Sequence, residues 1–362
     1  MFVSHLSLKD FRSYENLELS LKAGQNIFIG ENGEGKTNII EALMYLALLS
    51  SHRISNDQPL IKLGSERAYI RAKIESDERT TLVELEINNG KANRAKVNQN
   101  PVRSQKEILG LVKSVCFSPE DLDLVRGDPS ERRSFLDQLL IQQSPRLAGV
   151  ISDYERALKQ RNSLLKSRAP ESSLRSWSEH LATFGGELIA GRIKLINEIE
   201  PLFQIAYKNL SAKKLAKLGY KSSIPAPSSE KEVNKEVMLK VIEEVKSQEI
   251  ERGISLVGPH RDDLILNLGD HPVKGYASHG ESWSIALALR LASYQLFINE
   301  GAKPILILDD VFSELDEGRR EKLLEIADSA EQTFITVAVE NDLPKAIQGA
   351  RFKVEMGKVV IL

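Results

Sequence analysis

The sequence is poor in cysteine and has no long apolar run. Cys116 is the single cysteine among 362 residues, which excludes a disulfide framework or a cysteine zinc cluster and favours a reducing compartment. No run approaches the roughly 18 apolar residues of a membrane span, and Lys9 and Asp10 interrupt the start before a signal peptide could form. We therefore expect a cytoplasmic protein that makes no membrane contact.

Neither sign of charge dominates, because 49 basic side chains face 51 acidic ones and the net charge is −2. Net charge therefore argues neither for nor against a nucleic-acid partner, which would need a local basic patch. At roughly 100–200 residues per domain, the length allows two or three domains.

A glycine-rich segment follows a short apolar strand. Residues 25–30, QNIFIG, have the composition of a buried strand, and residues 38–49, NIIEALMYLALL, that of a helix. The intervening GENGEGKT matches G-x-x-x-x-G-K-[ST], in which backbone N–H groups close around phosphates at a helix N-terminus. We expect Lys36 to bind the β- and γ-phosphates of ATP and Thr37 to bind Mg²⁺. The predicted nucleotide site also includes Gly30, Glu31, Asn32, Gly33, Glu34, Gly35 and Asn38.

A second apolar strand, PILILDD at 304–310, ends in two acids. By itself this pattern also fits an ordinary strand end or helix cap. Beside a glycine loop it predicts that Asp309 holds Mg²⁺ through its water shell and that Asp310 acts as general base on the attacking water.

A serine and a glycine begin another expected helix, just before that strand. The motif consists of Ser278, His279, Gly280 and Glu281, and a plain helix N-cap is its alternative interpretation. The order of glycine loop, serine helix, acidic strand and then Ser313 to Asp316 resembles the ATP-binding-cassette ATPases. That resemblance implies a dimer in which the serine helix of one subunit completes the nucleotide site of the other.

Roughly 270 residues separate Lys36 from Asp309, so an insertion must divide the head. Apolar residues recur at heptad spacing over 147–165 and again over 188–210, which predicts a short antiparallel helical hairpin. The expected fold class is α/β, a P-loop head split by this hairpin. We divide the chain into 1–120, the N-terminal part of the head; 121–250, the inserted arm; and 251–362, the C-terminal part of the head.

Positive charge gathers in two places. Residues 91–113 hold six basic side chains and one acidic, and residues 155–175 also have an excess of basic side chains. A solvated face explains such runs equally well, but they permit contact with a phosphate backbone. The expected DNA contacts in these two runs are Lys91, Arg94, Lys96, Arg103, Arg156 and Lys159.

Several separate segments occur in one order along nearly the whole chain: LSLKDFRSYENLELSLKAGQNIFIGENGEGKTNIIEAL, FSPEDLDLVRGDPSERRSFLD, SLVGPHRDDLILNL, YASHGE and LILDDVFSELD. Together they resemble the RecF family of bacterial DNA replication and repair ATPases. The resemblance implies a head similar to those of SMC proteins, with a short arm. It further implies ATP-dependent dimerisation on double-stranded DNA near gaps, slow DNA-stimulated hydrolysis, work with RecR and RecO in recombinase loading, and SOS induction.

The resemblance carries roles over to particular residues. It implies that Lys36 binds the phosphates and that Thr37 binds Mg²⁺. It implies that Asp309 is the metal carboxylate, Asp310 the catalytic carboxylate and Asp316 the D-loop aspartate. Residues 278–281 would be the signature that reaches across the dimer. Two departures are visible. The signature ends in Glu281 where many relatives have Gln, and no histidine follows the strand 333–339. A cassette ATPase generally places its γ-phosphate sensor there, so we expect slow hydrolysis. No glutamine loop is assigned, although 117–122 lies in a plausible place.

Three other clusters have two interpretations each. Arg12 matches a position near the nucleotide in the family, or is a surface arginine. Arg132 and Arg133 contact DNA or a partner, or pair with Glu131 and Asp137 at helical spacing. The segment 260–262, His-Arg-Asp, is a family hallmark, or a purely structural group at the start of a strand, and we assign no chemistry to it.

Two other functions are kept as alternatives. A transporter-type cassette subunit would dock to a membrane partner, against which the helical insertion argues. A DNA-binding scaffold that holds ATP with little turnover is closer, and Asp310 argues against it.

Overall fold

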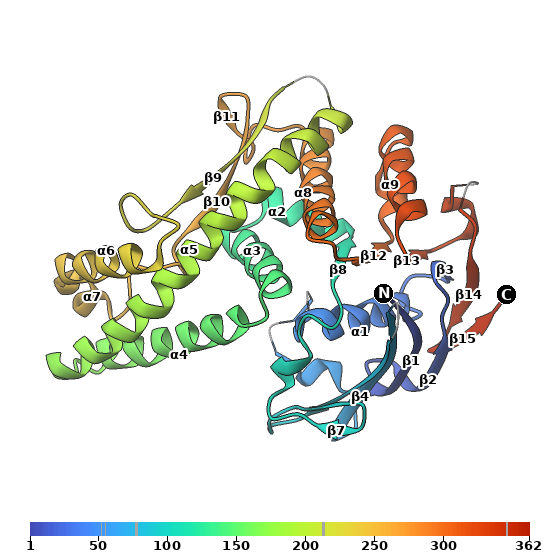
Figure 1. Ribbon diagram of the computed structural model, residues 1–362, viewed down its shortest axis with the longest axis horizontal. Helices are drawn as coiled ribbons and strands as arrows, with labels where there is room; N and C mark the ends of the chain where they lie inside the picture. The colour runs from blue at the N-terminus through green and yellow to red at the C-terminus, as the bar shows by residue number, and fades with distance from the viewer. Residues whose placement is uncertain (52, 55, 77–78, 212–213, 345–346) are drawn as a thin grey trace. The chain divides into compact units, whose positions relative to one another are not determined.

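The computed structural model describes residues 1–362 except 52, 55, 77–78, 212–213 and 345–346. The chain forms two compact units (Figure 1). The first contains Met1–Asp121 and Leu287–Leu362, and the second contains Leu122–Ala286. Over the described residues, no helix combines the length and apolar character that crossing a membrane requires.

The first unit contains two six-stranded sheets. One is antiparallel, in the order β2-β1-β4-β5-β6-β7, and the other has the order β15-β14-β3-β13-β12-β8. The strands of the first sheet are β1 (Phe2–Phe11), β2 (Tyr14–Ser20), β4 (Arg67–Ser76), β5 (Arg79–Asn88), β6 (Arg94–Val97) and β7 (Asn100–Pro101). Those of the second are β3 (Gly24–Ile29), β8 (Ser114–Phe117), β12 (Ile305–Asp309), β13 (Gln332–Val337), β14 (Ala350–Glu355) and β15 (Lys358–Ile361).

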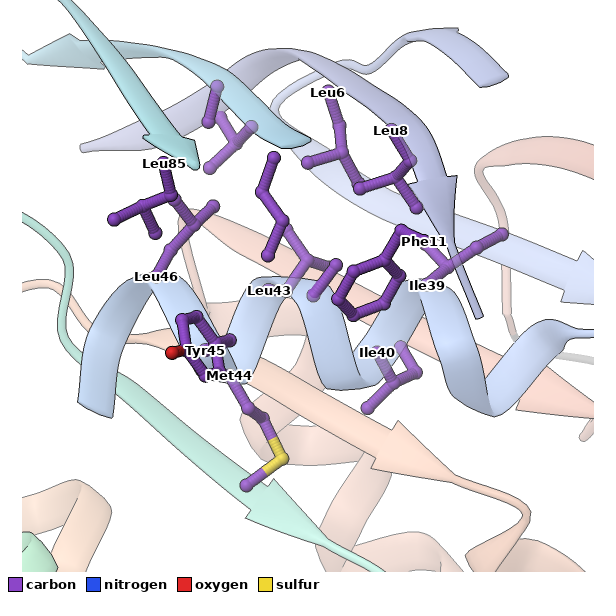
Figure 2. Packing of buried hydrophobic residues seen from close by; sticks show 14 of the residues in the cluster. Leu6, Leu8, Phe11, Ile39, Ile40, Leu43, Met44, Tyr45, Leu46 and Leu85 are labelled. Carbon is purple, nitrogen blue, oxygen red and sulfur yellow. The ribbon is translucent and has the colours of Figure 1, made fainter. Parts of the chain in front are cut away.

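Helix α1 (Lys36–Leu48) supplies the centre of this unit's core. Its residues are apolar on nearly every side, and eleven of the thirteen are buried, as expected for a helix covered on more than one face. Figure 2 shows Ile39 and Leu43 of α1 pointing toward Leu6 and Phe11 of β1. The same cluster includes Phe28, Phe334 and Ile307 of the second sheet. Burial of α1 therefore fixes where its first residue, Lys36, must lie.

Parallel pairing brings the predicted motifs to one sheet edge. Strand β13 pairs in parallel with β3 on one side and with β12 on the other. Thr336 of β13 lies opposite Asp309, and Val337 lies opposite Ile29, after which the glycine loop begins. Because neighbouring strands are about 4.8 Å apart, the loop and the acidic strand end are separated by only about 10 Å. The first unit also holds α9 (Glu317–Ser329).

The second unit is mainly helical. Its two long neighbours, α4 (Leu147–Lys166) and α5 (Glu171–Leu210), form the expected hairpin, and α5 continues past Pro201 (Figure 1). The other elements are α2 (Leu122–Arg126), α3 (Pro129–Gln143), β9 (Ala216–Lys221), α6 (Lys231–Glu244), α7 (Lys246–Arg252), β10 (Asp263–Leu268) and β11 (His271–Pro272). The three strands make a small antiparallel sheet. Helix α8 (His279–Asn299) begins here and ends in the first unit.

The division differs from the expected one at its second boundary. Residues 251–286, which we had placed with the C-terminal part of the head, cluster with the second unit. The reason is pairing over a long sequence distance: β10 pairs with β9 from Asp263–Lys221 to Leu268–Ala216. Hydrophobic periodicity carries no information about which strands pair, so the boundary could not be predicted from it.

Candidate nucleotide-binding site

A cavity of about 980 Å³ lies at the ends of β3 and β12 in the first unit. It is lined by the glycine loop, by Arg12 and Ser13, by the segment 58–65 except Leu60, and by Asp310, Ser313 and Glu314. The predicted phosphate loop and one predicted carboxylate therefore face the same space. Its size falls at the upper end for small-molecule sites.

The glycine loop is shaped by two backbone positions that favour glycine. Gly33 and Gly35 have φ values of 91° and 114°, in the left-handed region. Lys36 follows as the first residue of α1 and is 3% exposed. Its Nζ donates hydrogen bonds to the carbonyl oxygens of Gly30 at 2.7 Å and Glu31 at 3.2 Å, so the cation lies inside the curve of the loop.

Neighbouring segments hold the loop from outside. The Tyr14 hydroxyl donates to the carbonyl of Gly35 at 3.0 Å, and Asn38 Nδ2 donates to Ser13 Oγ at 2.9 Å. The turn between β14 and β15 also reaches it, because Gly357 N donates to the carbonyl of Glu34 at 3.3 Å. Motif spacing alone did not reveal these supports, which come from opposite ends of the chain.

The two acids at the end of β12 lie in different surroundings. Asp309 is buried, and its Oδ1 accepts a hydrogen bond from Thr336 Oγ1 at 2.5 Å. Asp310 lines the cavity, with Oδ2 3.8 Å from Lys36 Nζ. The Thr336 hydroxyl also accepts from Asp310 N at 2.9 Å. Thr336 was not predicted as a site residue; its place directly opposite Asp309 in the sheet is what brings it there.

Burial and negative neighbours raise the pKa of both acids. Burial, with the charges of Asp310 and Glu120, raises the pKa of Asp309 to about 6. Burial also raises the pKa of Asp310, even though Lys36 opposes this effect. Both acids are therefore less stable as charged carboxylates here than in water, and a divalent cation bound beside them would relieve this cost.

Arg12 is bound to a carboxylate on the cavity wall. Its Nε and Nη2 donate to the two oxygens of Glu41 at 2.7 and 2.6 Å, and Arg53 Nη1 lies 3.8 Å from the same carboxylate. Burial alone would raise the pKa of Glu41, but hydrogen bonds from Arg12 and Ser51 outweigh it and the pKa is lowered. Glu41 is the single acid in the apolar run 38–49, and that isolation is a sequence signal for a buried partner.

The sequence has no histidine after the strand 333–339, and no glutamine loop was assigned at 117–122. None of the described residues that line the cavity is a histidine, and β13 is followed by Ala338 and Val339. In the segment 117–122, Pro119 lines the cavity, whereas Asp121 accepts two hydrogen bonds from Arg290, at 2.9 and 2.7 Å. Asp121 is thus occupied within the protein.

The signature residues lie in the second unit, at the start of α8. Ser278 Oγ accepts from Glu281 N at 3.3 Å, while Ser278 N donates to Glu281 Oε2 at 2.9 Å, a reciprocal helix cap. Hydrogen bonds from Lys214 and from Ser278 lower the pKa of Glu281 to about 2. Ser278 and His279 are exposed and Gly280 is partly exposed. Glu281 thus caps the N-terminus of its own helix.

Asp316 of the predicted D-loop caps α9, where its Oδ1 accepts from Arg319 N at 3.0 Å. Ser313 and Glu314, just before it, line the cavity. The cavity contacts of Ser313 and Glu314 and the helix cap of Asp316 fit a loop that runs from the cavity to the start of α9.

The expected DNA-binding residues divide into exposed and buried groups. Six of them are exposed: Lys91, Arg94, Lys96, Arg103, Arg156 and Lys159. Arg156 pairs with Asp153 at 2.8 Å, and Lys96 Nζ lies 3.9 Å from Glu84. One exposed cation in each unit therefore has a neighbouring carboxylate that offsets its charge.

Arg132 does not belong with them. It is buried, binds both oxygens of Asp263 at 2.7 and 2.9 Å, and donates to the carbonyl of Gly127 at 3.1 Å. Arg133 is partly buried and donates to the carbonyl of Asp262 at 2.9 Å. The helix-spaced partner we had considered, Asp137, pairs with Arg192 instead. The expectation of a DNA contact at Arg132 is withdrawn, because its donors are already bound inside the protein.

The His-Arg-Asp segment at 260–262 is built into the second unit. Asp262 accepts hydrogen bonds from Tyr220 at 2.7 Å and from Ser223 N at 2.6 Å. His260 Nδ1 lies 2.5 Å from the Tyr154 hydroxyl, and its Nε2 faces the carbonyl of Ser255 at 3.2 Å. Burial lowers the pKa of His260 to about 4. These contacts explain the segment as a structural junction.

The fold and the cavity define a class: a nucleotide-binding head of the cassette and SMC type. The family described as RecF/RecN/SMC N terminal domain matches residues 2–358. The DNA replication and repair protein RecF of Streptomyces avermitilis is 52% identical over 371 residues, which cover 99% of each chain. The chain belongs to the RecF family, and the resemblance inferred from its motifs is confirmed.

Two solved structures match the fold of this chain, one at a higher and one at a lower sequence identity. A structure described as the recombination mediator protein RecF-ATPrS in the RecFOR pathway matches with a TM-score of 0.92 and 28% identity, covering 100% of this chain and 98% of that one. The Smc head domain of Pyrococcus furiosus matches with a TM-score of 0.56 and 17% identity, covering 100% and 96%. The second match shows the shared fold alone.

Proposed function

We propose that the protein binds ATP with Mg²⁺ in the 980 Å³ cavity, dimerises when ATP is bound, and engages double-stranded DNA near gaps until slow hydrolysis releases it. One observation carries the proposal. Lys36, held inside the glycine loop that follows β3, lies 3.8 Å from Asp310, which directly follows β12, two places from β3 in the sheet. A phosphate-binding cation and a catalytic carboxylate thus meet at one strand edge.

The donors at this edge suit Mg²⁺. Thr37 supplies a hydroxyl on the cavity wall and Asp309 a buried carboxylate, both of them the hard oxygen ligands that Mg²⁺ prefers. The ion would neutralise charge on the phosphates. Thr336 holds Asp309 in place through its hydroxyl, which fixes one carboxylate oxygen and leaves the other for a water of the ion's shell.

Asp310 is placed to accept a proton from the attacking water. It faces the cavity, and its raised pKa brings it nearer to the range in which a carboxylate works as a base. No histidine follows the strand 333–339, where a cassette ATPase generally has its γ-phosphate sensor, and this supports slow turnover. The same absence favours a second candidate, a scaffold that holds ATP without meaningful hydrolysis.

The dimer and the DNA contact rest on exposed groups. Ser278 caps its helix yet remains exposed, so its hydroxyl and the helix N-terminus are available to a phosphate held by a second copy. Lys91, Arg94, Lys96 and Arg103 are exposed around β6 and β7 and suit a phosphate backbone. Relatives assigned to the RecFOR pathway support RecR and RecO as protein partners.

The deciding experiment measures ATP hydrolysis and dimerisation without DNA and with single-stranded, duplex and gapped duplex DNA. Turnover stimulated by gapped duplex supports the proposal, whereas ATP-dependent binding with no turnover supports the scaffold. The variant Asp310→Asn should slow hydrolysis by about 10²–10⁴-fold while ATP still binds through Lys36 and Thr37. Glu325→Gln, which changes an exposed acid on α9, is the matched control.

Ser278→Arg tests the shared site. A bulky cation there should abolish ATP-dependent dimerisation and turnover together, while each monomer keeps its ATP affinity. A variant that sediments as a dimer with ATP and hydrolyses normally contradicts the trans role.

A further inference from the structure

An exposed pair of stacked rings precedes the signature. The rings of His271 and Tyr276 lie with centroids 5.8 Å apart and planes 17° from parallel. Tyr276 is 73% exposed. Such exposure is unusual for a large aromatic ring, because burying the ring against its own unit would be favourable. The tyrosine ring thus lies at the surface of the second unit, beside the ring of His271.

The loop that carries the ring is ordered. Val273 is buried, and its carbonyl accepts hydrogen bonds from Tyr276 N at 3.1 Å and Ala277 N at 3.0 Å. Lys274 Nζ donates to the carbonyl of Gly127 at 2.8 Å. Tyr276 is therefore presented by a fixed turn, which lowers the entropy lost when the ring is covered by a partner.

Sequence distance ties this ring to the signature. Tyr276 lies two residues before Ser278, so their Cα atoms are at most about 7.6 Å apart. If Ser278 reaches a nucleotide held by a second copy, Tyr276 must come within side-chain reach of that copy's cavity wall. This step rests on the proposed function, because it assumes the ATP-dependent dimer.

The cavity wall offers an apolar counterpart. Leu63 lines the cavity and is 100% exposed, next to Gly64 with its φ of 90° and to the partly exposed Lys62. An exposed leucine is by itself ordinary. Here, however, a fully exposed leucine marks the rim of the cavity that the signature must face, and an exposed aromatic ring marks the signature.

We propose that the ring pair His271–Tyr276 is a contact surface for a second copy of this chain and docks on the rim of its nucleotide cavity around Leu63. The two-fold symmetry of a head-to-head dimer makes this contact twice. The ring pair would add buried apolar surface to the phosphate contact made by Ser278. The affinity between the two copies would then not depend on the nucleotide alone.

The first test compares Tyr276→Ala with Tyr276→Phe by sedimentation velocity at saturating ATP. Loss of the ring should weaken dimerisation by about 10- to 100-fold, the scale of an aromatic hot spot, whereas the phenylalanine variant should stay within about threefold of wild type. ATP affinity of the monomer, measured by calorimetry below the dimerisation concentration, should not change. Unaltered far-UV circular dichroism and thermal midpoints show that both variants fold.

The second test mixes Tyr276→Ala with Leu63→Ser. Each variant alone damages both contacts of its homodimer, but a mixed dimer carries both changes at one contact and keeps the other intact. Mixing the two at saturating ATP should therefore give more dimer than either variant alone. The ATP affinity of the Leu63→Ser monomer is measured first, so that saturation is assured.

The outcomes separate this contact from the proposed function. Wild type that remains monomeric with ATP contradicts the shared site and the ring contact together. Wild type that dimerises, with Tyr276→Ala dimerising equally well, overturns the ring contact alone. A mixture that gains nothing over the single variants also overturns it, because the ring then meets something other than the Leu63 rim, such as the nucleotide base.

Discussion

One group of charged residues in the second unit and one in the first unit have opposite roles. In the second unit, Arg161 is buried against Glu249, with Nη2 2.5 Å from Oε2, and also donates to Ser178 and Ser255. Arg192 binds both oxygens of Asp137 in the same way. In the first unit, Lys36, Asp309 and Asp310 gather at a cavity, and the two acids keep raised pKa values.

The difference separates a closed network from an open site. A buried arginine that donates a hydrogen bond from each of its three nitrogens holds two segments in register and is occupied within the protein. A cavity whose acids repel one another stores unfavourable electrostatic energy that a bound cation or nucleotide can release. Residue type alone does not distinguish a closed network from an open site. The number of hydrogen-bond and ion-pair partners that each charged residue has inside the protein does.

The largest expected effect breaks the open site. Lys36→Met removes the cation on the β- and γ-phosphates, so ATP affinity should fall by at least about 10³-fold, the scale of a strong charge-assisted contact. The thermal midpoint should move by only a few degrees, because Nζ faces the glycine loop and the cavity rather than the apolar core. Calorimetric titration with ATP and a melting curve measure both. Lys22→Met, at an exposed position, is the control, and ATP binding within twofold of wild type contradicts the site assignment.

Local motifs allowed most of the site in the first unit to be predicted from the sequence. In the second unit, contacts between residues far apart in the sequence limited what could be predicted. The glycine loop and the acidic strand end are recognisable because their chemistry needs fixed spacing over a few residues. Arg132 looked like a surface cation because its acceptor, Asp263, lies 131 residues away in sequence. Thr336 and Glu41 were missed for the same reason. The role of Thr336 depends on Asp309 in the neighbouring strand, and that of Glu41 depends on Arg12.

The closed network should fail when one partner is removed. Arg161→Met leaves Glu249 buried without its counter-charge, and we expect a loss of about 3–5 kcal/mol in the free energy of unfolding. Replacing both residues by methionine should recover most of that loss, because no unpaired charge remains. Urea unfolding measures the effect. Arg175→Met, which removes an exposed pair with Glu179 at 3.6 Å, should change stability by less than about 0.5 kcal/mol.

A loss below about 1 kcal/mol for Arg161→Met would show that water reaches Glu249 and that the network is more open than its geometry indicates.

A smaller effect follows from pH. Burial lowers the pKa of His260 from 6.5 to about 4, so between these values the unfolded chain binds more protons than the folded one. Stability should therefore be full above pH 6.5 and fall as pH decreases toward 4, by about 2–3 kcal/mol from this residue. His260→Gln retains a donor and an acceptor for Ser255 and Tyr154 but cannot titrate, so its unfolding free energy should lose less between pH 7.5 and 4.5. Equal pH slopes in wild type and variant would contradict a buried neutral histidine.

The smallest expected effect compares exposed cations of the two units. Arg94 on β6 is exposed, whereas Arg156 on α4, also exposed, has Asp153 at 2.8 Å, which offsets its charge. If both face DNA, Arg94→Gln should reduce ATP-dependent duplex affinity by roughly threefold and lower the slope of log affinity against log salt by about one, as expected for one lost phosphate contact. Arg156→Gln should lower that slope by less, because its neighbouring carboxylate already repels a phosphate. Fluorescence anisotropy with a gapped duplex over a range of salt concentrations measures both slopes. A larger slope change for Arg156→Gln would place the DNA on the helical arm rather than on the β6–β7 side of the first unit.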